Sequence, residues 1–209
     1  MRAAKVSRLS ESKRMFESDL FEFFSRIPPW QPPAIYLPVI AWSSYQAFAV
    51  GTGIVSFLGL FVVGLLAWTL MEYWLHRLVF HYAPSSHFGK RLIWYAHGVH
   101  HDWPNDKLRL VFPPAVSLPI AVLAWILFTM VFGEFDRYAA FVGLVSGYLA
   151  YDMLHYYAHH FVPSTRAGRY LRKYHLMHHH GDEDAKYGVS SPLWDLVFRT
   201  TGRPTSRAS

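Results

Sequence analysis

Long runs of apolar residues alternate with short polar segments along this 209-residue chain. Residues 34–71 contain no Lys, Arg, Asp or Glu, and residues 110–133 form a second uncharged stretch. One helix over residues 34–71 would be about 57 Å long, whereas the apolar core of a bilayer is about 30 Å thick. The first stretch therefore predicts two membrane-spanning helices, with a turn at residues 51–53 (Gly-Thr-Gly).

A polar turn at residues 134–137 separates the second uncharged stretch from a further helical pattern. The second and fourth helical patterns are longer than the bilayer is thick. Because the expected number of crossings is even, the ends of both patterns emerge on the same side of the membrane. We expect a helical cap there. Two re-entrant hairpins that never cross the membrane are the alternative. We therefore expect an all-α integral membrane fold with four transmembrane helices, at about residues 34–50, 54–75, 113–133 and 138–158.

The segment before the first expected span carries an amphipathic pattern at residues 15–27. Glu17, Ser18 and Glu22 lie on the face opposite its apolar positions. This pattern predicts a helix that lies on the bilayer surface or packs on the protein's own cap. We expect residues 1–33 to form an N-terminal segment and residues 34–209 to form one domain. The apolar positions of the pattern are Phe16, Leu20, Phe23, Phe24 and Ile27.

Composition and charge agree with a membrane protein. Charged residues make up 16% of the chain, against about 25% in a soluble domain. The net charge is +6, but the basic residues do not surround a nucleic-acid-reading motif, so we expect no nucleic acid partner. All of the 20 Lys and Arg residues except Arg137 lie on one side of the expected topology. By the positive-inside tendency, both termini and the cap are cytoplasmic.

The chain contains no Cys, which excludes disulfides, iron–sulfur clusters and thiolate-bound zinc. Twelve of its 13 histidines fall instead in four patches, which contain the patterns HxxxxH, HxxHH, HxxxH and HxxHH. Neutral imidazole binds borderline transition metals, so four patches beside a membrane indicate a polynuclear metal site that acts on a lipid. The candidate ligands are His76, His81, His97, His100, His101, His155, His159, His175, His178 and His179.

Spacing favours shared metals within most patches. Residues four apart, as in HxxxH, lie on one helix face, and the three rings of HxxHH could serve two metals because adjacent rows diverge. His76 and His81 lie about 140° apart on a regular helix. Either the helix loosens there, as in a π-bulge, or each ring serves a different metal. We leave His87, His160 and His180 outside the ligand set.

Two carboxylates lie near the patches. Glu72 precedes His76 by four residues, and Asp152 precedes His155 by three. Each could accept an imidazole N–H and fix its tautomer. The alternative for both is a helix-end charge at the membrane boundary, although a charge in so apolar a run as that around Asp152 calls for a partner.

The order of the four histidine patterns resembles the fatty acid hydroxylase superfamily of membrane di-iron enzymes, and in particular the fatty acid 2-hydroxylases that act on sphingolipid acyl chains. The "D-x-x-RLV-PP" run and the "GVSSPLWD" tail are not required for metal binding, so they distinguish subfamilies better than the histidines do. The matching stretches are EYWLHRLVFH (72–81), WYAHGVHHDWPNDKLRLVFPP (94–114), YDMLHYYAHH (151–160) and KYHLMHHHGDEDAKYGVSSPLWDLVFRT (173–200).

The resemblance implies two iron ions held by the ten candidate histidines. Zinc could also occupy the site in the purified protein, because imidazole suits zinc as readily as iron. It implies O2 activation and insertion of one oxygen at the α carbon of an acyl chain, in a ceramide- or sphingolipid-type lipid. Residues 1–33 are too few for a fused cytochrome b5 domain, so we expect a separate cytochrome b5-type or ferredoxin-type electron donor. The expected location is the bacterial inner membrane or the endoplasmic reticulum.

Two segments are candidates for the lipid entrance, residues 102–114 and residues 187–198. For the tryptophans among them, interfacial anchoring is an equal alternative. The expected lining residues are Trp103, Leu110, Val111, Phe112, Leu193, Trp194 and Phe198.

The sequence also allows functions other than fatty acid hydroxylation. Within enzymes, the alternatives are a related sterol oxidase, a carotenoid hydroxylase or an acyl desaturase. The non-enzyme alternative is a membrane protein for metal transport or storage. Transport requires polar groups inside the spans, and the uncharged stretches 34–71 and 110–133 contain no charged residue.

Overall fold

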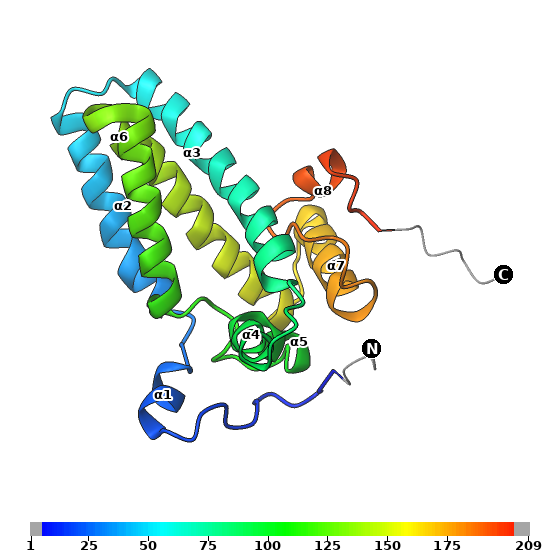
Figure 1. Ribbon diagram of the computed structural model, residues 1–209. Coiled ribbons are helices and arrows are strands. Elements are labelled where there is room, and N and C mark those ends of the chain that lie inside the picture. The colour runs from blue at the N-terminus through cyan, green and yellow to red at the C-terminus, as the bar shows by residue number, and fades with distance from the viewer. Residues whose placement is uncertain (1–5, 203–209) are drawn as a thin grey trace.

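The computed structural model describes residues 6–202, and every regular element within that range is a helix. The expectation of an all-α fold is therefore confirmed. Long helices form a bundle, and the shorter helices lie around and beside one end of it (Figure 1). The elements are α1 (Asp19–Phe24), α2 (Gln31–Ala49), α3 (Ile54–Trp74), η1 (Leu75–Phe80), α4 (His87–Ile93), η2 (Trp94–Gly98), α5 (Val99–Asp102), α6 (Pro114–His160), α7 (Arg166–His180) and α8 (Leu193–Val197).

The 47-residue helix α6 folds back on itself at Gly133, where φ is 74° and ψ is −171°. Figure 1 shows its two halves running in opposite directions beside α2 and α3. The rings of Trp125 and Tyr138, which lie in different halves, are 5.3 Å apart. Residues 134–137, which we expected to form a polar turn, are helical. One glycine with positive φ makes the reversal, since glycine adopts that conformation without steric cost.

Two stretches are long and apolar enough to cross a membrane, Ile54–Phe80 and Pro114–His160. Only 11% and 17% of their apolar windows are buried within the protein. A core helix of a soluble protein would be mostly buried, so these exposed apolar faces agree with a lipid environment. The helix α2 begins at Gln31, three residues before the expected start of the first span.

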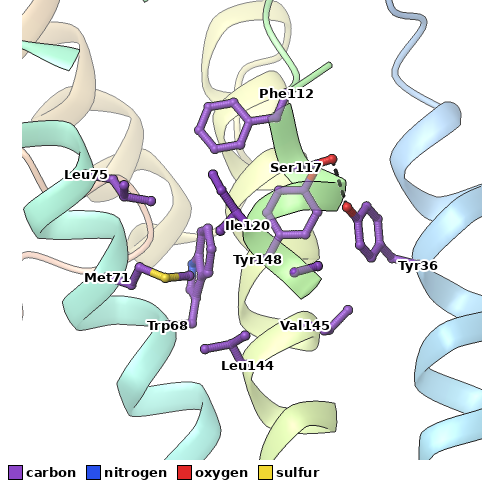
Figure 2. Close-up of a pocket in the computed structure, with 11 residues that line it drawn as sticks. Tyr36, Trp68, Met71, Leu75, Phe112, Ser117, Ile120, Leu144, Val145 and Tyr148 are labelled. Atoms are coloured by element: carbon purple, nitrogen blue, oxygen red, sulfur yellow. Dashed lines mark hydrogen bonds between the residues drawn. The ribbon is translucent and has the colours of Figure 1, made fainter. Parts of the chain in front are cut away.

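Small residues allow α3 and α6 to pack closely. A Cβ atom on Gly64 would clash with the backbone carbonyl of Ala140, and one on Gly143 would clash with the carbonyl of Phe61. Farther along the bundle, a pocket of about 20 Å³ lies between α2, α3 and α6 (Figure 2). There Tyr36 Oη donates to Ser117 Oγ at 2.8 Å and joins α2 to the start of α6.

The N-terminal segment differs from the expected helix over residues 15–27. Only residues 19–24 are helical, and Glu22, which we placed on the solvent face, is buried. Its carboxylate accepts backbone N–H bonds from Met15 and Phe16 at 2.9 and 3.2 Å and pairs with the guanidinium of Arg109. Because Arg109 is 7% exposed, this ion pair attaches the segment to the loop before α6. The expected domains also include residues 1–5 and 203–209, which lie outside the described residues.

Candidate metal centre

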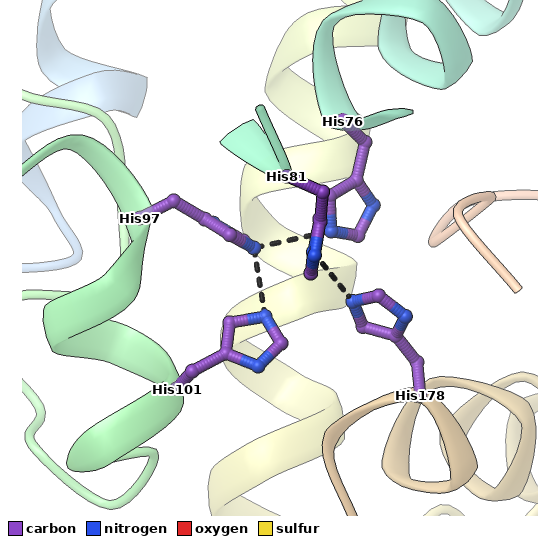
Figure 3. A group of neighbouring side chains, drawn as sticks. All are labelled: His76, His81, His97, His101 and His178. Atoms are coloured by element: carbon purple, nitrogen blue, oxygen red, sulfur yellow. Dashed lines mark hydrogen bonds between the residues drawn. The ribbon is translucent and has the colours of Figure 1, made fainter. Parts of the chain in front are cut away.

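The ten candidate histidines converge into two groups of five beyond the end of the bundle. Each histidine of a group directs one ring nitrogen toward the others, and these nitrogens all lie within 4.8 Å of one another. Figure 3 shows group one, whose rings come from η1 and the residue after it, η2, α5 and α7, and point toward a common centre. Group one is His76, His81, His97, His101 and His178, and group two is His100, His155, His159, His175 and His179.

A π-helical turn brings His76 and His81 into the same group. Residues 75–80 form η1, and the backbone N–H of His81 donates to the carbonyl of His76 at 3.1 Å. That i→i+5 bond is the π-helical pattern. It underwinds the helix so that residues five apart face the same way. Of the two possibilities that the spacing left open, the structure shows the loosened helix.

Each HxxHH triad contributes to both groups. His97 and His101 belong to group one, whereas His100 belongs to group two. In α7 the division is reversed, because His178 belongs to group one and the other two histidines of its triad belong to group two. The continuous segment η2–α5 and the helix α7 therefore each carry ligands of both groups and hold the groups side by side. The rings of His101 and His179, one from each group, stack with centroids 4.1 Å apart.

The spacing between ring nitrogens fits metal coordination. Seven pairs of Nε2 atoms within the groups lie 2.8–3.1 Å apart. Imidazole nitrogen binds a metal such as zinc at about 2.0–2.1 Å, so two ligands at right angles lie about 3 Å apart. Five converging Nε2 atoms with no carboxylate among them form a neutral donor set that suits iron or zinc.

Burial keeps these imidazoles neutral. It lowers the pKa of His178 to about 3, with a further contribution from His81. Burial is also the largest cause that lowers the pKa values of His100 and His179, and the neighbouring imidazoles add to it. A neutral ring keeps a lone pair on one nitrogen, which is the form that binds a metal.

Backbone carbonyls hold two rings of group one. His76 Nδ1 donates to the carbonyl of Tyr187 at 2.5 Å, and His178 Nδ1 donates to the carbonyl of Ala185 at 2.7 Å. This arrangement places the proton on Nδ1 and leaves the Nε2 lone pair directed into the group, as is common for metal-binding histidines. The two carbonyl partners were not expected from the sequence.

Neither carboxylate that we expected beside the histidines bonds to an imidazole in the structure. Glu72 accepts backbone N–H bonds from Val189 and Ser190 at 2.6 and 2.8 Å. Asp152 is fully buried, and one of its oxygens lies 3.4 Å from the backbone nitrogen of Phe112. Glu72 therefore contacts the tail of the chain that supplies the carbonyls, and Asp152 contacts the loop before α6.

The three histidines that we left out, His87, His160 and His180, lie outside both groups. A cavity of about 270 Å³ reaches His97 of group one and His100 of group two. Its remaining lining is mostly apolar. It includes Leu110, Val111 and Phe112 of the expected entrance, together with Phe16, Phe21, Phe24, Leu92, Tyr95, Ala115 and Val116.

The position of this cavity differs in part from the expected entrance. Trp103, Leu193, Trp194 and Phe198 do not line it. Trp194 Nε1 instead donates to Thr69 Oγ1 at 3.0 Å, and Phe198 stacks on Tyr73. The tail over residues 187–198 therefore packs on α3. The N-terminal segment supplies part of the cavity wall in its place, through Met15, Phe16, Phe21 and Phe24. This role was not expected from the sequence.

Comparisons with known proteins agree with the motifs. A family model described as fatty acid hydroxylase matches residues 61–200, which include all ten histidines of the two groups. A dihydroceramide fatty acyl 2-hydroxylase of Arabidopsis thaliana is 38% identical over 198 residues, covering 95% of this chain and 83% of that protein. A fatty acid 2-hydroxylase of Rattus norvegicus is 36% identical, covering 90% of this chain and 56% of that protein. A solved structure titled full-length scs7p, with only the hydroxylase domain visible, aligns with a TM-score of 0.86 at 34% identity, covering 93% of this chain and 74% of that one.

Proposed function

This chain belongs to the fatty acid hydroxylase family, and we propose that it inserts one oxygen atom from O2 at the α carbon of a lipid acyl chain. Its relatives are named as fatty acid 2-hydroxylases, so the chain is a hydroxylase-type oxidoreductase. The proposed substrate is an acyl chain of a ceramide- or sphingolipid-type lipid. The names of two relatives, which refer to dihydroceramide and to ceramide, support this choice.

One observation carries the proposal: a single apolar cavity touches both five-histidine groups. A metal transport or storage protein has no need for an apolar cavity beside its metals. A hydroxylase needs one, because a C–H bond must be held beside the metals while water is excluded.

The proposed ligands are the two groups as the geometry divides them. His76, His81, His97, His101 and His178 would hold one iron, and His100, His155, His159, His175 and His179 would hold the other. Zinc would fit the same neutral imidazole set, so the purified protein could hold zinc in place of iron. When bound, the metal pair supplies the oxidation of a C–H bond by O2. The overall reaction converts C–H and O2, with two electrons and two protons, into C–OH and one water.

The cavity suggests how the acyl chain is positioned. Leu110 and Val111 are buried beside it, and the N-terminal segment adds Phe16 and Phe24 to its wall. An acyl chain lying along these side chains would place its carbonyl end near His97 and His100. The carbon next to the carbonyl would then lie nearest the metals, whereas a mid-chain carbon would require a longer chain path past them.

The membrane arrangement that fits this site has four crossings. In it α2, α3 and the two halves of α6 span the bilayer, and residues 75–112 and 160–202 form a cytoplasmic cap around the histidines. Residues 1–33 lie on the cytoplasmic surface and residues 34–209 form the catalytic domain. The exposed apolar faces of α3 and α6 support this arrangement. The bilayer is that of the bacterial inner membrane or of the endoplasmic reticulum.

The electrons would come from a separate cytochrome b5-type or ferredoxin-type protein. Neither the two histidine groups nor the cavity contains a cysteine for an iron–sulfur centre, because the chain has none. A carrier in the cytoplasm could approach the cap, since the histidines lie on η1 and the residue after it, on η2, α5 and α7, and on the last turns of α6, at one end of the bundle.

Mass spectrometry of lipids from cells that express the full chain tests the proposal. We expect one added oxygen on the acyl group, at the carbon next to the carbonyl. Loss of two hydrogens would instead identify a desaturase, and oxidation of a sterol or carotenoid would identify one of the other enzyme classes. An unchanged lipid profile, together with metal uptake into vesicles that hold the purified protein, would favour transport.

Ligand variants connect the activity to the metals. His155→Ala and His178→Ala should each lower the metal content and abolish hydroxylation, because each removes one of five donors. His87→Ala is the matched control, since that ring is exposed and lies outside both groups. Normal hydroxylation and full metal content in His155→Ala would contradict the proposed ligand set.

A further inference from the structure

The turn that follows α7 forms hydrogen bonds with histidine rings of only one of the two groups. It offers the carbonyls of Ala185 and Tyr187 to His178 and His76, both in group one. Among the described residues, no hydrogen-bond partner contacts the buried Nδ1 atoms of four group-two rings. These rings are His100, His155, His175 and His179. Backbone of this turn therefore orients two rings of group one and, among the described residues, none of group two, although His101 of group one also has no partner at its Nδ1 atom.

The backbone of this turn is held in an uncommon conformation. Lys186, between the two carbonyls, has a φ of 62°, in the left-handed region that non-glycine residues seldom adopt. Its N–H donates to the carbonyl of Thr200 at 2.8 Å. Such a conformation persists only where the surrounding structure holds it, so other contacts must fix residues 185–188.

Asp195 supplies those contacts. Its two carboxylate oxygens accept the backbone N–H groups of Tyr187 at 2.9 Å and Gly188 at 2.8 Å, and Thr200 Oγ1 donates to it at 2.7 Å. Asp195 is fully buried, and burial of a carboxylate is costly unless hydrogen bonds satisfy it. The backbone of Tyr187 is therefore held at both ends, by Asp195 at its N–H and by His76 at its carbonyl.

Two neighbouring features complete the arrangement. Glu72, one helical turn before His76 on α3, accepts the N–H groups of Val189 and Ser190. Gly188 leaves no room for a side chain, because a Cβ there would clash with the carbonyl of Ser191 and lie 3.0 Å from Asp195 Oδ2. These contacts give a structural reason for the "GVSSPLWD" tail that metal binding alone does not require.

We propose that Asp195 is a positioning residue for the metal held by group one: it fixes residues 185–188 so that Tyr187 and Ala185 orient His76 and His178. The inference rests on the proposed function for the presence of two metals. It predicts that loss of Asp195 weakens one metal site and leaves the other intact, because group two takes no hydrogen bond from this turn.

The test is the metal stoichiometry of the purified full chain carrying Asp195→Asn. Asn is nearly isosteric, but its amide NH₂ cannot accept the second backbone N–H. Titration of the metal-depleted protein with zinc should give two sites in the wild type. In the variant, one site should keep its affinity and the other should weaken by about tenfold or more, as for other outer partners of metal ligands. Asp182→Asn, an exposed carboxylate near the same turn, should keep both sites.

Double variants identify which site is affected. Asp195→Asn combined with His155→Ala should lose both strong sites, because each change damages a different group. When Asp195→Asn is combined with His76→Ala, zinc binding should weaken little beyond that of His76→Ala alone, because both changes damage group one. Equal weakening of both sites in Asp195→Asn, or no weakening of either, would overturn the inference.

Two further results separate the possible failures. If Asp195→Asn does not fold, Thr200→Val replaces it. This change keeps the carboxylate and removes the Thr200 hydroxyl, with its bonds to Asp195 and to Tyr73 Oη. It should weaken one site by a smaller factor, and two unchanged sites in it would overturn the inference. A wild-type chain that binds no metal pair would instead contradict the proposed function itself.

Discussion

At the scale of single residues, the spacing of histidines matters less than the local helix geometry. His76 and His81 would diverge on a regular α-helix, and η1 brings them together through its i→i+5 hydrogen bond. A second π-helical turn, η2, begins three residues before His97 and ends just after it. π-turns are often found at functional sites, and here they set the directions of three group-one ligands.

The cavity beside the histidines leads to a prediction at one residue. Ala115 lines it from the first turn of α6, whereas Leu118 lies one turn later and outside it. Ala115→Trp should fill the cavity mouth and lower kcat/KM on the lipid substrate by about tenfold or more. Leu118→Trp adds a similar side chain to an exposed position and should have little effect. Equal kcat/KM values for the two variants would contradict the location of the acyl site.

The ion pair between Glu22 and Arg109 leads to a pH prediction. Burial by itself would raise the pKa of Glu22, but the N–H bonds from Met15 and Phe16 and the charge of Arg109 outweigh it, so the pKa is lowered from 4.5. A lowered carboxyl pKa stabilises the closed segment above pH 4.5, and this stability is lost as the pH falls through the lowered value. The protection factors of the amide hydrogens over residues 12–27, which correct for the slower intrinsic exchange in acid, should therefore fall at acidic pH.

The variant Glu22→Gln should show faster exchange already at pH 7. Leaving Arg109 buried without its charge partner costs about 1–3 kcal/mol, which corresponds to roughly 5- to 150-fold faster exchange in this segment. Glu17→Gln, at an exposed position of the same segment, should behave like the wild type. A Glu22→Gln variant with wild-type exchange at pH 7 would show that the ion pair does not hold the segment.

At the scale of helices, α3 and α6 form the support from which both histidine groups extend. Each continues beyond the apolar bundle and carries ligands in its last turns, His76 and His81 after α3 and His155 and His159 on α6. Their relative position depends on the close approach at Gly64 and Gly143. A shift of this contact would change the distance between the two ends of the site.

Gly64→Leu should destabilise the protein, because its side chain meets the backbone of Ala140. The expected loss is about 1–3 kcal/mol or more, seen as a lower thermal unfolding temperature in detergent and as weaker metal retention. Gly59→Ala is the matched control on the same helix, since nothing lies within 4 Å of its added Cβ. It should be neutral or slightly stabilising, because alanine favours the helix over glycine. A Gly64→Leu protein as stable as the wild type would rule out close packing at this crossing.

At the scale of the whole molecule, the apolar bundle and the proposed cap have different roles. The bundle exposes apolar surface on α3 and α6, and the cap collects the polar ligands at one end. In the proposed membrane arrangement, the imidazoles lie at the end of the bundle, outside the bilayer core and largely shielded from bulk water. This separation explains how a chain with little charge can hold ten histidines beside a membrane.

Single-cysteine labelling tests the four-crossing arrangement, and the absence of native cysteine makes each introduced thiol unique. Thr52→Cys and Asp136→Cys, at the far end of the bundle, should react with a membrane-impermeant reagent from the side opposite the cytoplasm. Ser85→Cys and Ser164→Cys, near the histidines, should react only after the cytoplasmic face is opened. Labelling of Thr52→Cys and Ser164→Cys from the same side would favour re-entrant hairpins.

The sequence by itself determined the helical class, the positions of the long apolar helices and the ten histidines that converge. Apolar periodicity and residue spacing are properties of neighbours on one helix, so they can be read without knowledge of other elements. Hydrophobicity also located most of α6, although not its single-residue reversal at Gly133.

Only the tertiary structure decided how those histidines divide into two groups and what holds them. The assignment of His100 to one group and His101 to the other depends on which helices face η2 and α5. The bond of His76 to the carbonyl of Tyr187 and the pairing of Glu22 with Arg109 join segments far apart in sequence. Such contacts follow from packing between elements, which local patterns do not encode.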